Sequence, residues 1–521
     1  MVARMSLCDP ASLETLLDEL RRSMRALLHD VCRELHTDYA RSVTRLVLPV
    51  DLFRLIGEAL PQEAFSNWKV VGWIEELNDL LFFVDVMEQL RGERDRRVFA
   101  ERLLEDSADL FYEHSYREEL FPEGEPDPAG LPTRLSALSV RLARRITQEA
   151  VFLIPRVSCQ WVATQRRRQR QVPWTAAHEF ERVECAGTIP VGYEGERISL
   201  PGLPLGKEDD APSALLTVIR PDGISMTHNG HDWPVYSLTP GPVCHGTFLK
   251  AAPIAGSSMT LGPALIYGKD LTPRRIGTVS RRQAERVAWA ISIIRQVWPV
   301  GAAQLTLLTS RVVPLWAGGV VSFSYRTRPG LSVVNVFDRD DLDLIDDLIH
   351  ENSHHHLNLL LRKYRMQRRD RSRELFYSPW RRSLRPLRGI LHATFTFTMG
   401  AMLFERISTA AAAKTLPATG GGSLSKEQVL RARFRCLEEL ESVRYSMNDL
   451  RYAADQLQWL TAHGVALVDA MDRAAQGIRR KIEPFRAQVM RSKYGADLRA
   501  HVASLQEAKQ VYGKARESGL R

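Results

Sequence analysis

The stretch Leu348-Ile349-His350-Glu351-Asn352-Ser353-His354 decides how the rest of this sequence is interpreted, because it contains the pattern His-Glu-x-x-His. It continues an acidic and apolar run, Asp341 to Asp347, that is typical of the first turns of a helix. Residues four apart share one face of a helix, so His350 and His354 can present two imidazoles to one metal ion with Glu351 beside them. We therefore expect a metal site on this helix.

Two β-like runs precede the expected helix. Gly319 to Tyr325 and Leu331 to Phe337 are rich in β-branched and aromatic residues, and Arg326 to Gly330 between them has the composition of a turn. We predict a β-hairpin that leads into a metal-bearing helix, as in a zincin-like core. His355 and His356 fall on other faces of the helix and are not expected to bind the metal.

The predicted fold class is α+β and mainly helical. Apolar residues recur at three-to-four spacing before residue 155, short β-like segments with Pro and Gly follow, and a second helical pattern begins after a glycine-rich loop at 417–423. We predict four parts. They are a helical accessory domain at 1–155, a small β-rich region at 156–255, the metal-binding catalytic core at 256–415 and a C-terminal helical region at 416–521.

The order of elements within the predicted core follows from the same patterns. A helix from Arg281 to Trp298 and a strand from Gln304 to Thr309 come before the hairpin. After the metal-bearing helix we expect a basic loop and a further helix from about Pro386 to Ile407. The hairpin strand Leu331 to Phe337 would offer its edge to an extended peptide substrate.

The composition bounds the class of protein. At 521 residues the chain can bury an ample core without a metal or disulfides, so a bound metal would be functional. The six cysteines include no Cys-x-x-Cys pair, which argues against a disulfide framework and a cysteine-based zinc module. The sequence contains neither a signal-like start nor a long apolar run. We therefore expect a cytoplasmic protein that does not enter the membrane.

The net charge of +9 indicates an acidic partner without identifying it. Nucleic acid is one such partner, but charge alone speaks only to non-specific attraction. The basic runs Arg166 to Arg170 and Arg362 to Arg369 would equally attract an acidic leader peptide. The peptide is the partner we favour.

The identity of the third metal ligand separates the possible reactions. The longer motif His-Glu-x-x-His-x-x-Gly-x-x-His is excluded because Leu357 and Leu360 occupy its glycine and histidine positions. A zinc peptidase could use Glu374 or Glu405 as the third ligand and Glu351 as the general base. His392, on an apolar helix downstream, is the other option, and Arg381, Arg385 and Arg388 lie just before it in sequence.

Several of these residues form an ordered set along the chain. The set consists of the Arg-Pro-Gly turn, His350-Glu351-x-x-His354, Leu375-Phe376-Tyr377-Ser378-Pro379-Trp380-Arg381, Arg385-Pro386 and Leu391-His392. It resembles the iron- and 2-oxoglutarate-dependent peptide β-hydroxylases of the His-Glu-x-x-His type, which accompany ribosomally synthesised and modified peptides. The resemblance covers roughly residues 256–410.

The resemblance implies an iron(II) ion held by His350, His354 and His392, with 2-oxoglutarate bound beside it. It also implies that the distal carboxylate of 2-oxoglutarate needs a cation, for which Arg381 and Arg385 are candidates with Arg388 behind them. Arginine forks bind carboxylates with two parallel hydrogen bonds. The implied enzyme is a dioxygenase that hydroxylates a side-chain β-carbon of a peptide, and Glu351 would then orient a ligand or the substrate.

Two alternatives remain open on the sequence. Imidazole suits zinc as well as iron, so a zinc metallopeptidase with Glu351 as its base is the second hypothesis. A non-catalytic protein that binds a peptide or a nucleic acid through its basic surface is the third.

Overall fold

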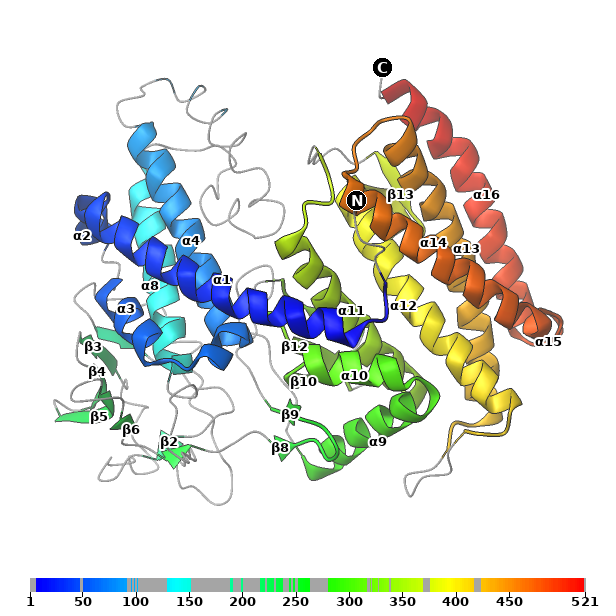
Figure 1. Cartoon of the computed structure of the whole chain (residues 1–521), viewed down its shortest axis with the longest axis horizontal. Helices are drawn as coiled ribbons and strands as arrows, with labels where there is room; N and C mark the ends of the chain where they lie inside the picture. Colours follow the sequence, from blue (N-terminus) through cyan, green and yellow to red (C-terminus); the bar gives the residue numbers. More distant parts are fainter. Residues whose placement is uncertain are drawn as a thin grey trace.

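The computed structural model describes residues 6–46, 50–90, 129–150, 252–262, 280–315, 321–326, 328–336, 339–368, 375–416 and 423–519, with residues 95, 98, 101 and 319 and short strands between 188 and 248. Within this part of the chain the fold is mainly helical, as predicted (Figure 1). The basic run at 166–170 and Glu374 lie outside the described residues. The basic run at 362–369 is described up to residue 368.

The N-terminal region is helical, in agreement with the sequence pattern. Its longest helix, α1, begins after Asp9, whose side chain accepts a hydrogen bond from the backbone N–H of Ser12. Buried residues from Leu13 to Leu35 recur every three or four positions along α1 and form its apolar stripe. The helices are α1 (Pro10–Thr37), α2 (Ala40–Leu46), α3 (Val50–Ala59), η1 (Gln62–Ser66), α4 (Trp68–Gln89) and α8 (Leu131–Ala150).

Helix α1 links this region to the predicted core. Figure 1 shows it in dark blue, extending from α2, α4 and α8 across to α10 and α11, and it contacts both of these core helices. Near its start, the side-chain amide of Gln304 donates a hydrogen bond to the backbone carbonyl of Leu7. Lys363 at the end of α11 pairs with Glu19, and Arg362 pairs with Glu75 of α4.

Short strands occupy the predicted β-rich region. Antiparallel pairing gives one sheet of order β1-β3-β4-β5-β6 and a separate pair of β2 with β7. These strands are β1 (Thr188–Pro190), β2 (Ile198–Ser199), β3 (Leu216–Arg220), β4 (Gly223–His228), β5 (His231–Ser237), β6 (Val243–Cys244) and β7 (Thr247–Phe248).

The predicted core contains a mixed sheet of order β11-β12-β10-β9-β8. β12 is parallel to β10 and antiparallel to β11, so the predicted hairpin is present. Both edges of β12 are therefore occupied, and the expectation that a peptide pairs with this strand is wrong. The elements are β8 (Ala252–Pro253), β9 (Thr260–Leu261), α9 (Arg281–Val297), α10 (Pro299–Leu308), β10 (Arg311–Leu315), β11 (Phe323–Ser324) and β12 (Leu331–Asn335).

The predicted strand at Gln304–Thr309 is also wrong, because these residues belong almost entirely to helix α10. A short apolar run suits either a buried strand or a buried helix, and Pro299 at the first helical turn favours the helix. The strand begins only at Arg311, as β10.

Helix α12 lies at the centre of the second half of the chain. It packs against α11, α13 and α14, and the hairpin β13–β14 lies beside its N-terminal end. Figure 1 shows α12 in yellow between α11 and the C-terminal helices. The elements are α11 (Asp341–Lys363), β13 (Phe376–Ser378), β14 (Ser383–Arg385), α12 (Leu387–Ala412), α13 (Lys426–Asp455), α14 (Ala462–Ile482), η3 (Glu483–Phe485), α15 (Arg486–Met490) and α16 (Tyr494–Gly519).

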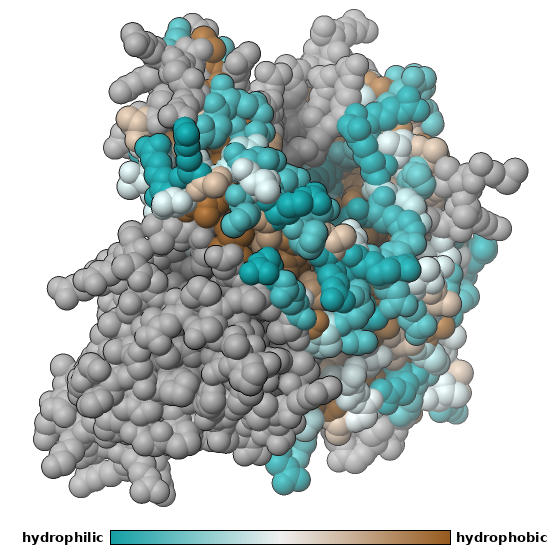
Figure 2. All heavy atoms as spheres, turned by 60° about the vertical axis from the view of Figure 1, so that its left-hand side comes forward, coloured by the Kyte–Doolittle hydropathy of each residue, from teal (hydrophilic) through white to brown (hydrophobic). Residues whose placement is uncertain are grey.

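One face of the described part of the chain is mostly hydrophilic. Figure 2 shows teal side chains over much of one face, with apolar residues visible chiefly in recesses between them. Val98, Val300, Val321 and Val511 are the large apolar side chains exposed on the described part of the chain. No described helix is both long and apolar enough to cross a membrane.

Candidate metal centre

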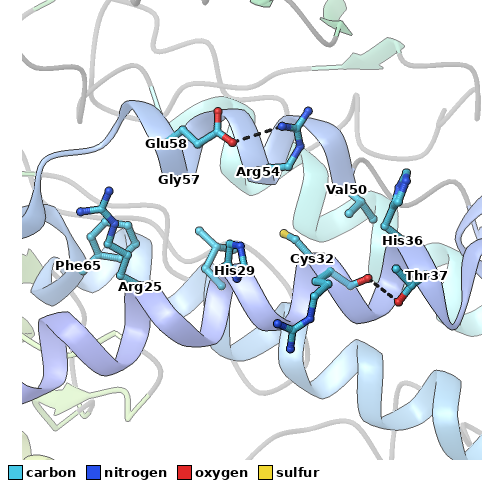
Figure 3. Close-up of a pocket in the computed structure, with 12 residues that line it drawn as sticks. Arg25, His29, Cys32, His36, Thr37, Val50, Arg54, Gly57, Glu58 and Phe65 are labelled. Carbon is cyan, nitrogen blue, oxygen red and sulfur yellow. Dashed lines mark hydrogen bonds and ion pairs between the residues drawn. The ribbon is translucent and has the colours of Figure 1, made fainter.

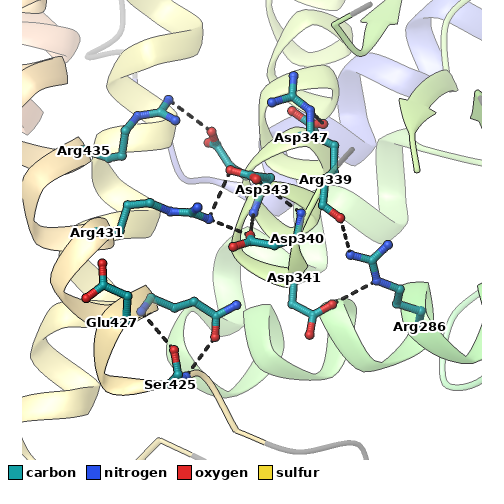
Figure 4. Close-up of polar contacts among 12 residues, drawn as sticks. Arg286, Arg339, Asp340, Asp341, Asp343, Asp347, Ser425, Glu427, Arg431 and Arg435 are labelled. Carbon is teal, nitrogen blue, oxygen red and sulfur yellow. Dashed lines mark hydrogen bonds and ion pairs between the residues drawn. The ribbon is translucent and has the colours of Figure 1, made fainter. Parts of the chain in front are cut away.

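Polar contacts at its N-terminus hold helix α11 in place. Asp340 accepts a hydrogen bond from the backbone N–H of Asp343, and the Asp343 side chain accepts one from the Asp340 N–H, so the two form a capping box. Arg431 of α13 pairs with both carboxylates, at 2.6 Å and 3.2 Å (Figure 4). These contacts fix the start of the helix that carries His350 and His354.

His350 and His354 lie next to each other on α11. Their ring centroids are 5.0 Å apart and their planes are 77° from parallel. Loss of water around the rings lowers the pKa of His350 to about 4 and lowers the pKa of His354 well below its ordinary value. Both imidazoles are therefore neutral at physiological pH, and the neutral ring is the form that binds a metal.

His392 lies beside this pair although it belongs to helix α12. Its ring centroid is 6.3 Å from that of His354, with the planes 28° apart. Burial lowers the pKa of His392 to about 4. Its Nε2 atom is buried and has no hydrogen-bond partner among the described residues, which is unusual for a buried polar atom. The fold thus places His354 next to each of the other two histidines predicted as ligands.

The three rings fit a metal in their chemistry but do not form a closed ligand set. A metal–nitrogen bond is about 2.1 Å long, so two imidazoles on one ion hold their ring centroids roughly 5 to 6 Å apart. The observed separations of 5.0 Å and 6.3 Å lie at or near this range. As the described side chains stand, no three His, Cys, Asp or Glu residues have the geometry of a complete metal site.

Glu351 points away from solvent, towards the predicted hairpin. Only 2% of its surface is exposed, whereas His350, His354 and His392 are half-buried. Burial raises the pKa of Glu351 to about 8, and the neighbouring Ser324 of β11 opposes the shift. The carboxyl group is therefore largely protonated at neutral pH, and its Oε2 atom lacks a hydrogen-bond partner in the described structure.

The three candidate arginines are placed unequally. Arg381 lies in the turn between β13 and β14, and its charge lowers the pKa of both His350 and His354, although burial is the larger cause in each case. Arg385 is half-buried on β14, where its backbone pairs with Phe376. Arg388 is half-buried in the first turn of α12. Arg381 is therefore the best placed of the three to bind an anion near the histidines.

Glu405 does not serve as a third ligand. It lies thirteen residues after His392 on α12, which corresponds to about 20 Å along the helix. Its carboxylate accepts a hydrogen bond from Thr409 and lies within 3.7 Å of Lys481 on α14. The peptidase hypothesis in its Glu405 form is wrong, and Glu374 lies outside the described residues.

His355 and His356 are turned away from the three histidines, as expected. The His355 ring contacts the Ser332 hydroxyl at 3.1 Å and accepts a hydrogen bond from the Gly330 N–H. His356 packs edge-to-face on Phe395 of α12. Both rings are buried, so they anchor α11 to the hairpin and to α12.

An aromatic wall beside His350 was not anticipated from the sequence. Phe397 of α12 lies edge-to-face on the His350 ring with centroids 4.9 Å apart. The Trp380 ring stacks on the Phe397 ring, with centroids 4.4 Å apart. The indole N–H of Trp380 donates a 2.7 Å hydrogen bond to Glu439 of α13. A Trp next to the Arg381 position was visible in the sequence, but its partners lie 17 and 59 residues away.

Two further arginines act on the histidines. Arg435 of α13 contributes to the low pKa of His350, and Arg326 in the hairpin turn contributes to that of His392, each after burial. Neither was predicted, because no local motif marks them. Arg435 is itself paired with Asp346, Glu438 and Glu439, so its charge is largely balanced, and Arg381 stays the candidate partner of an anionic co-substrate.

Comparisons with known proteins identify no family. No protein-family model matches the chain, and no curated protein matches it.

Proposed function

We propose that this protein is an iron(II)- and 2-oxoglutarate-dependent oxygenase that hydroxylates a side-chain β-carbon of a ribosomally synthesised peptide. The observation that carries the proposal is the approach of His392 on α12 to His354 on α11, with 6.3 Å between ring centroids. Both imidazoles are held neutral, and His392 Nε2 lacks a partner in the described structure. His350, His354 and His392 would hold the metal.

Iron(II) and 2-oxoglutarate, when bound, supply the oxidising chemistry: dioxygen, 2-oxoglutarate and a C–H bond are converted into succinate, carbon dioxide and a C–OH bond. The residues of the chain would bind and orient the metal, 2-oxoglutarate and the peptide. Arg381 would pair with the distal carboxylate of 2-oxoglutarate through two charge-assisted hydrogen bonds. Phe397 and Trp380 would exclude water on the His350 side of the site.

The position of Glu351 supports this function over a zinc metallopeptidase. A general base must reach a metal-bound water to accept its proton. Glu351 is more deeply buried than the three histidines, and its neighbour is Ser324 of β11. It is better suited to hold the hairpin against α11 beside Ser324 than to accept a proton at the metal.

Anaerobic reconstitution with ferrous iron, followed by exposure to oxygen and 2-oxoglutarate with co-encoded peptides, tests the proposal. We expect succinate and a peptide product heavier by one oxygen atom. Glu351→Gln should still form succinate, since the carboxamide has the shape of the protonated carboxyl. Peptide cleavage without succinate, abolished by Glu351→Gln, would instead select the zinc peptidase.

A further inference from the structure

The N-terminal helical region contains a cavity that the proposed chemistry does not use. It lies between α1 and α3, has a volume of about 450 Å³ and is closed at one end by Phe65 of η1 (Figure 3). Its floor is apolar, formed by Leu28, Cys32, Val50 and Phe65, all of which are buried. A cavity of this size accepts a few side chains of a partner rather than a folded domain.

Close approach of the two helices shapes the floor. A Cβ atom at Gly57 of α3 would lie 2.7 Å from Leu28 Cδ2 of α1, so a larger residue there would require the Leu28 side chain to shift. The apolar floor is therefore part of how α3 packs on α1, and it remains open between the two helices (Figure 3).

The rim of the cavity is basic, because three arginines and two histidines line it. Arg25, His29, Arg33 and His36 follow one another at three-to-four spacing on α1, so they share one side of the helix over about 16 Å. Arg54 lies opposite on α3, and Glu58 is the one acidic residue among the twelve described lining residues.

The rim cations are available to a ligand. Arg33 pairs with Asp30 at 3.0 Å and Arg54 pairs with Glu58 at 3.3 Å, and each of these pairs lies within a single helix and is exposed. Such surface pairs contribute little and exchange readily for another carboxylate. Arg25 donates a hydrogen bond to the half-buried side chain of Gln62 and lies over the Phe65 ring.

We propose that this cavity binds an acidic, amphipathic segment of a peptide, with apolar side chains on the floor and carboxylates along the rim. The distribution of the arginines along the rim favours a peptide over a single anionic head group. One head group engages only one point of the rim, whereas several carboxylates spaced along a chain engage both Arg25 and Arg33, about 12 Å apart on α1, and Arg54 on α3.

The course of α1 suggests what the peptide does. The same helix that forms the rim contacts α10 and α11 with its N-terminal half (Figure 1). From Arg33 to Glu19, which pairs with the end of α11, is about 21 Å along the helix. A leader segment held in the cavity would leave the following residues free to reach the histidines. This identification as a substrate leader rests on the proposed function.

Binding of a labelled synthetic peptide to the full-length, metal-free protein tests the site. The probe is a fluorescein-labelled helix former of roughly 16 residues with leucine at three-to-four spacing and glutamate elsewhere. Fluorescence anisotropy should show binding that weakens with salt. Probes with lysine in place of glutamate, or serine in place of leucine, should bind at least about tenfold more weakly.

Variants of the rim localise the binding. Arg33→Gln combined with Arg54→Gln should weaken binding of the acidic probe at least about fivefold. Arg22→Gln combined with Arg45→Gln removes two exposed cations outside the cavity and should change binding by less than about twofold. Equal affinity for the acidic and lysine probes, or equal effects of the two double variants, would overturn the inference.

Two further experiments distinguish this inference from the proposed function and from binding of a lipid. His392→Ala should bind the probe as the unmodified protein does, because the cavity is remote from the histidines. Loss of succinate formation with retained peptide binding would therefore reject only the oxygenase. Binding of laurate that depends on Arg33 and Arg54, without binding of the acidic probe, would overturn the peptide in favour of a fatty acid.

Discussion

The indole ring of Trp380 stacks on the phenyl ring of Phe397, with centroids 4.4 Å apart and planes within 5° of parallel. Phe397 in turn touches the His350 ring, and the Trp380 N–H is bonded to Glu439. The turn that carries Arg381 is therefore tied to α11, α12 and α13 by two aromatic contacts and a hydrogen bond. Such contacts hold a binding residue in position without touching the ligand.

Arg381→Gln tests the co-substrate site that follows from this placement. The variant loses the charge beside His350 and His354, so we expect the KM for 2-oxoglutarate to rise about tenfold or more with kcat changed less than about threefold. Steady-state succinate formation measures both. Arg382→Gln is the matched control, since Arg382 is an exposed neighbour, and it should leave the KM unchanged. An equal rise in both variants would contradict the assignment.

His392→Ala tests the third ligand directly. The variant removes one of three imidazoles, and we expect the affinity for Co(II), used as an oxygen-stable probe, to fall by at least about 100-fold. Titration of the cobalt absorption bands measures this. His463→Ala removes a half-buried histidine that stacks on Tyr364, and Glu405→Gln removes the rejected carboxylate ligand. Both controls should bind cobalt normally, and normal binding by His392→Ala would refute the metal site.

Glu439→Gln tests the electrostatics behind Trp380. Burial raises the pKa of Glu439 to about 7 from an ordinary value of 4.5. The folded state therefore retains a proton that the unfolded state has lost, and the free energy of unfolding falls as pH rises from 4.5 to 7, by up to about 3 kcal/mol from this group. Urea unfolding at several pH values measures the slope.

The glutamine variant is neutral at every pH and can still accept the Trp380 hydrogen bond. We expect its stability relative to the unmodified protein to increase with pH through this window. Arg435 keeps acceptors in the variant, because it also contacts Asp346 and Glu438. A difference that does not change between pH 4.5 and 7 would show that Glu439 is not protonated in the folded state.

Gly330→Ala tests the hairpin turn behind α11. Gly330 has φ +86°, and a Cβ atom there would lie 2.8 Å from the backbone oxygen of Leu308. We expect the substitution to lower the free energy of unfolding by about 2–4 kcal/mol, because it adds a backbone clash to the strain of a left-handed residue. Gly319 has φ +72°, and no described atom lies within 4 Å of a Cβ there, so Gly319→Ala should cost only about 1 kcal/mol. Similar losses in the two variants would contradict the clash.

Local sequence patterns were sufficient to predict the helices and strands that have distinctive end or turn residues. The acidic first turn and the three-to-four spacing predicted α11, and the turn composition at Arg326–Gly330 predicted the hairpin. The short apolar run at Gln304–Thr309 was assigned wrongly, since its length fits a buried strand and a buried helix equally. Likewise, the exposure of the β12 edge depended on whether β10 would pair with it.

The sequence by itself determined that His350, Glu351 and His354 share a helix, because a period of 3.6 residues places positions four apart on one face. His392 and Arg381 became candidates through the resemblance of an ordered set of motifs to the iron- and 2-oxoglutarate-dependent hydroxylases. Only the tertiary structure brought His392 to His354, set Phe397 and Trp380 beside His350 and turned Glu351 into the interior. These relationships depend on how α12 packs against α11 and α13, and long-range packing follows from the fit of whole side-chain surfaces rather than from any local pattern.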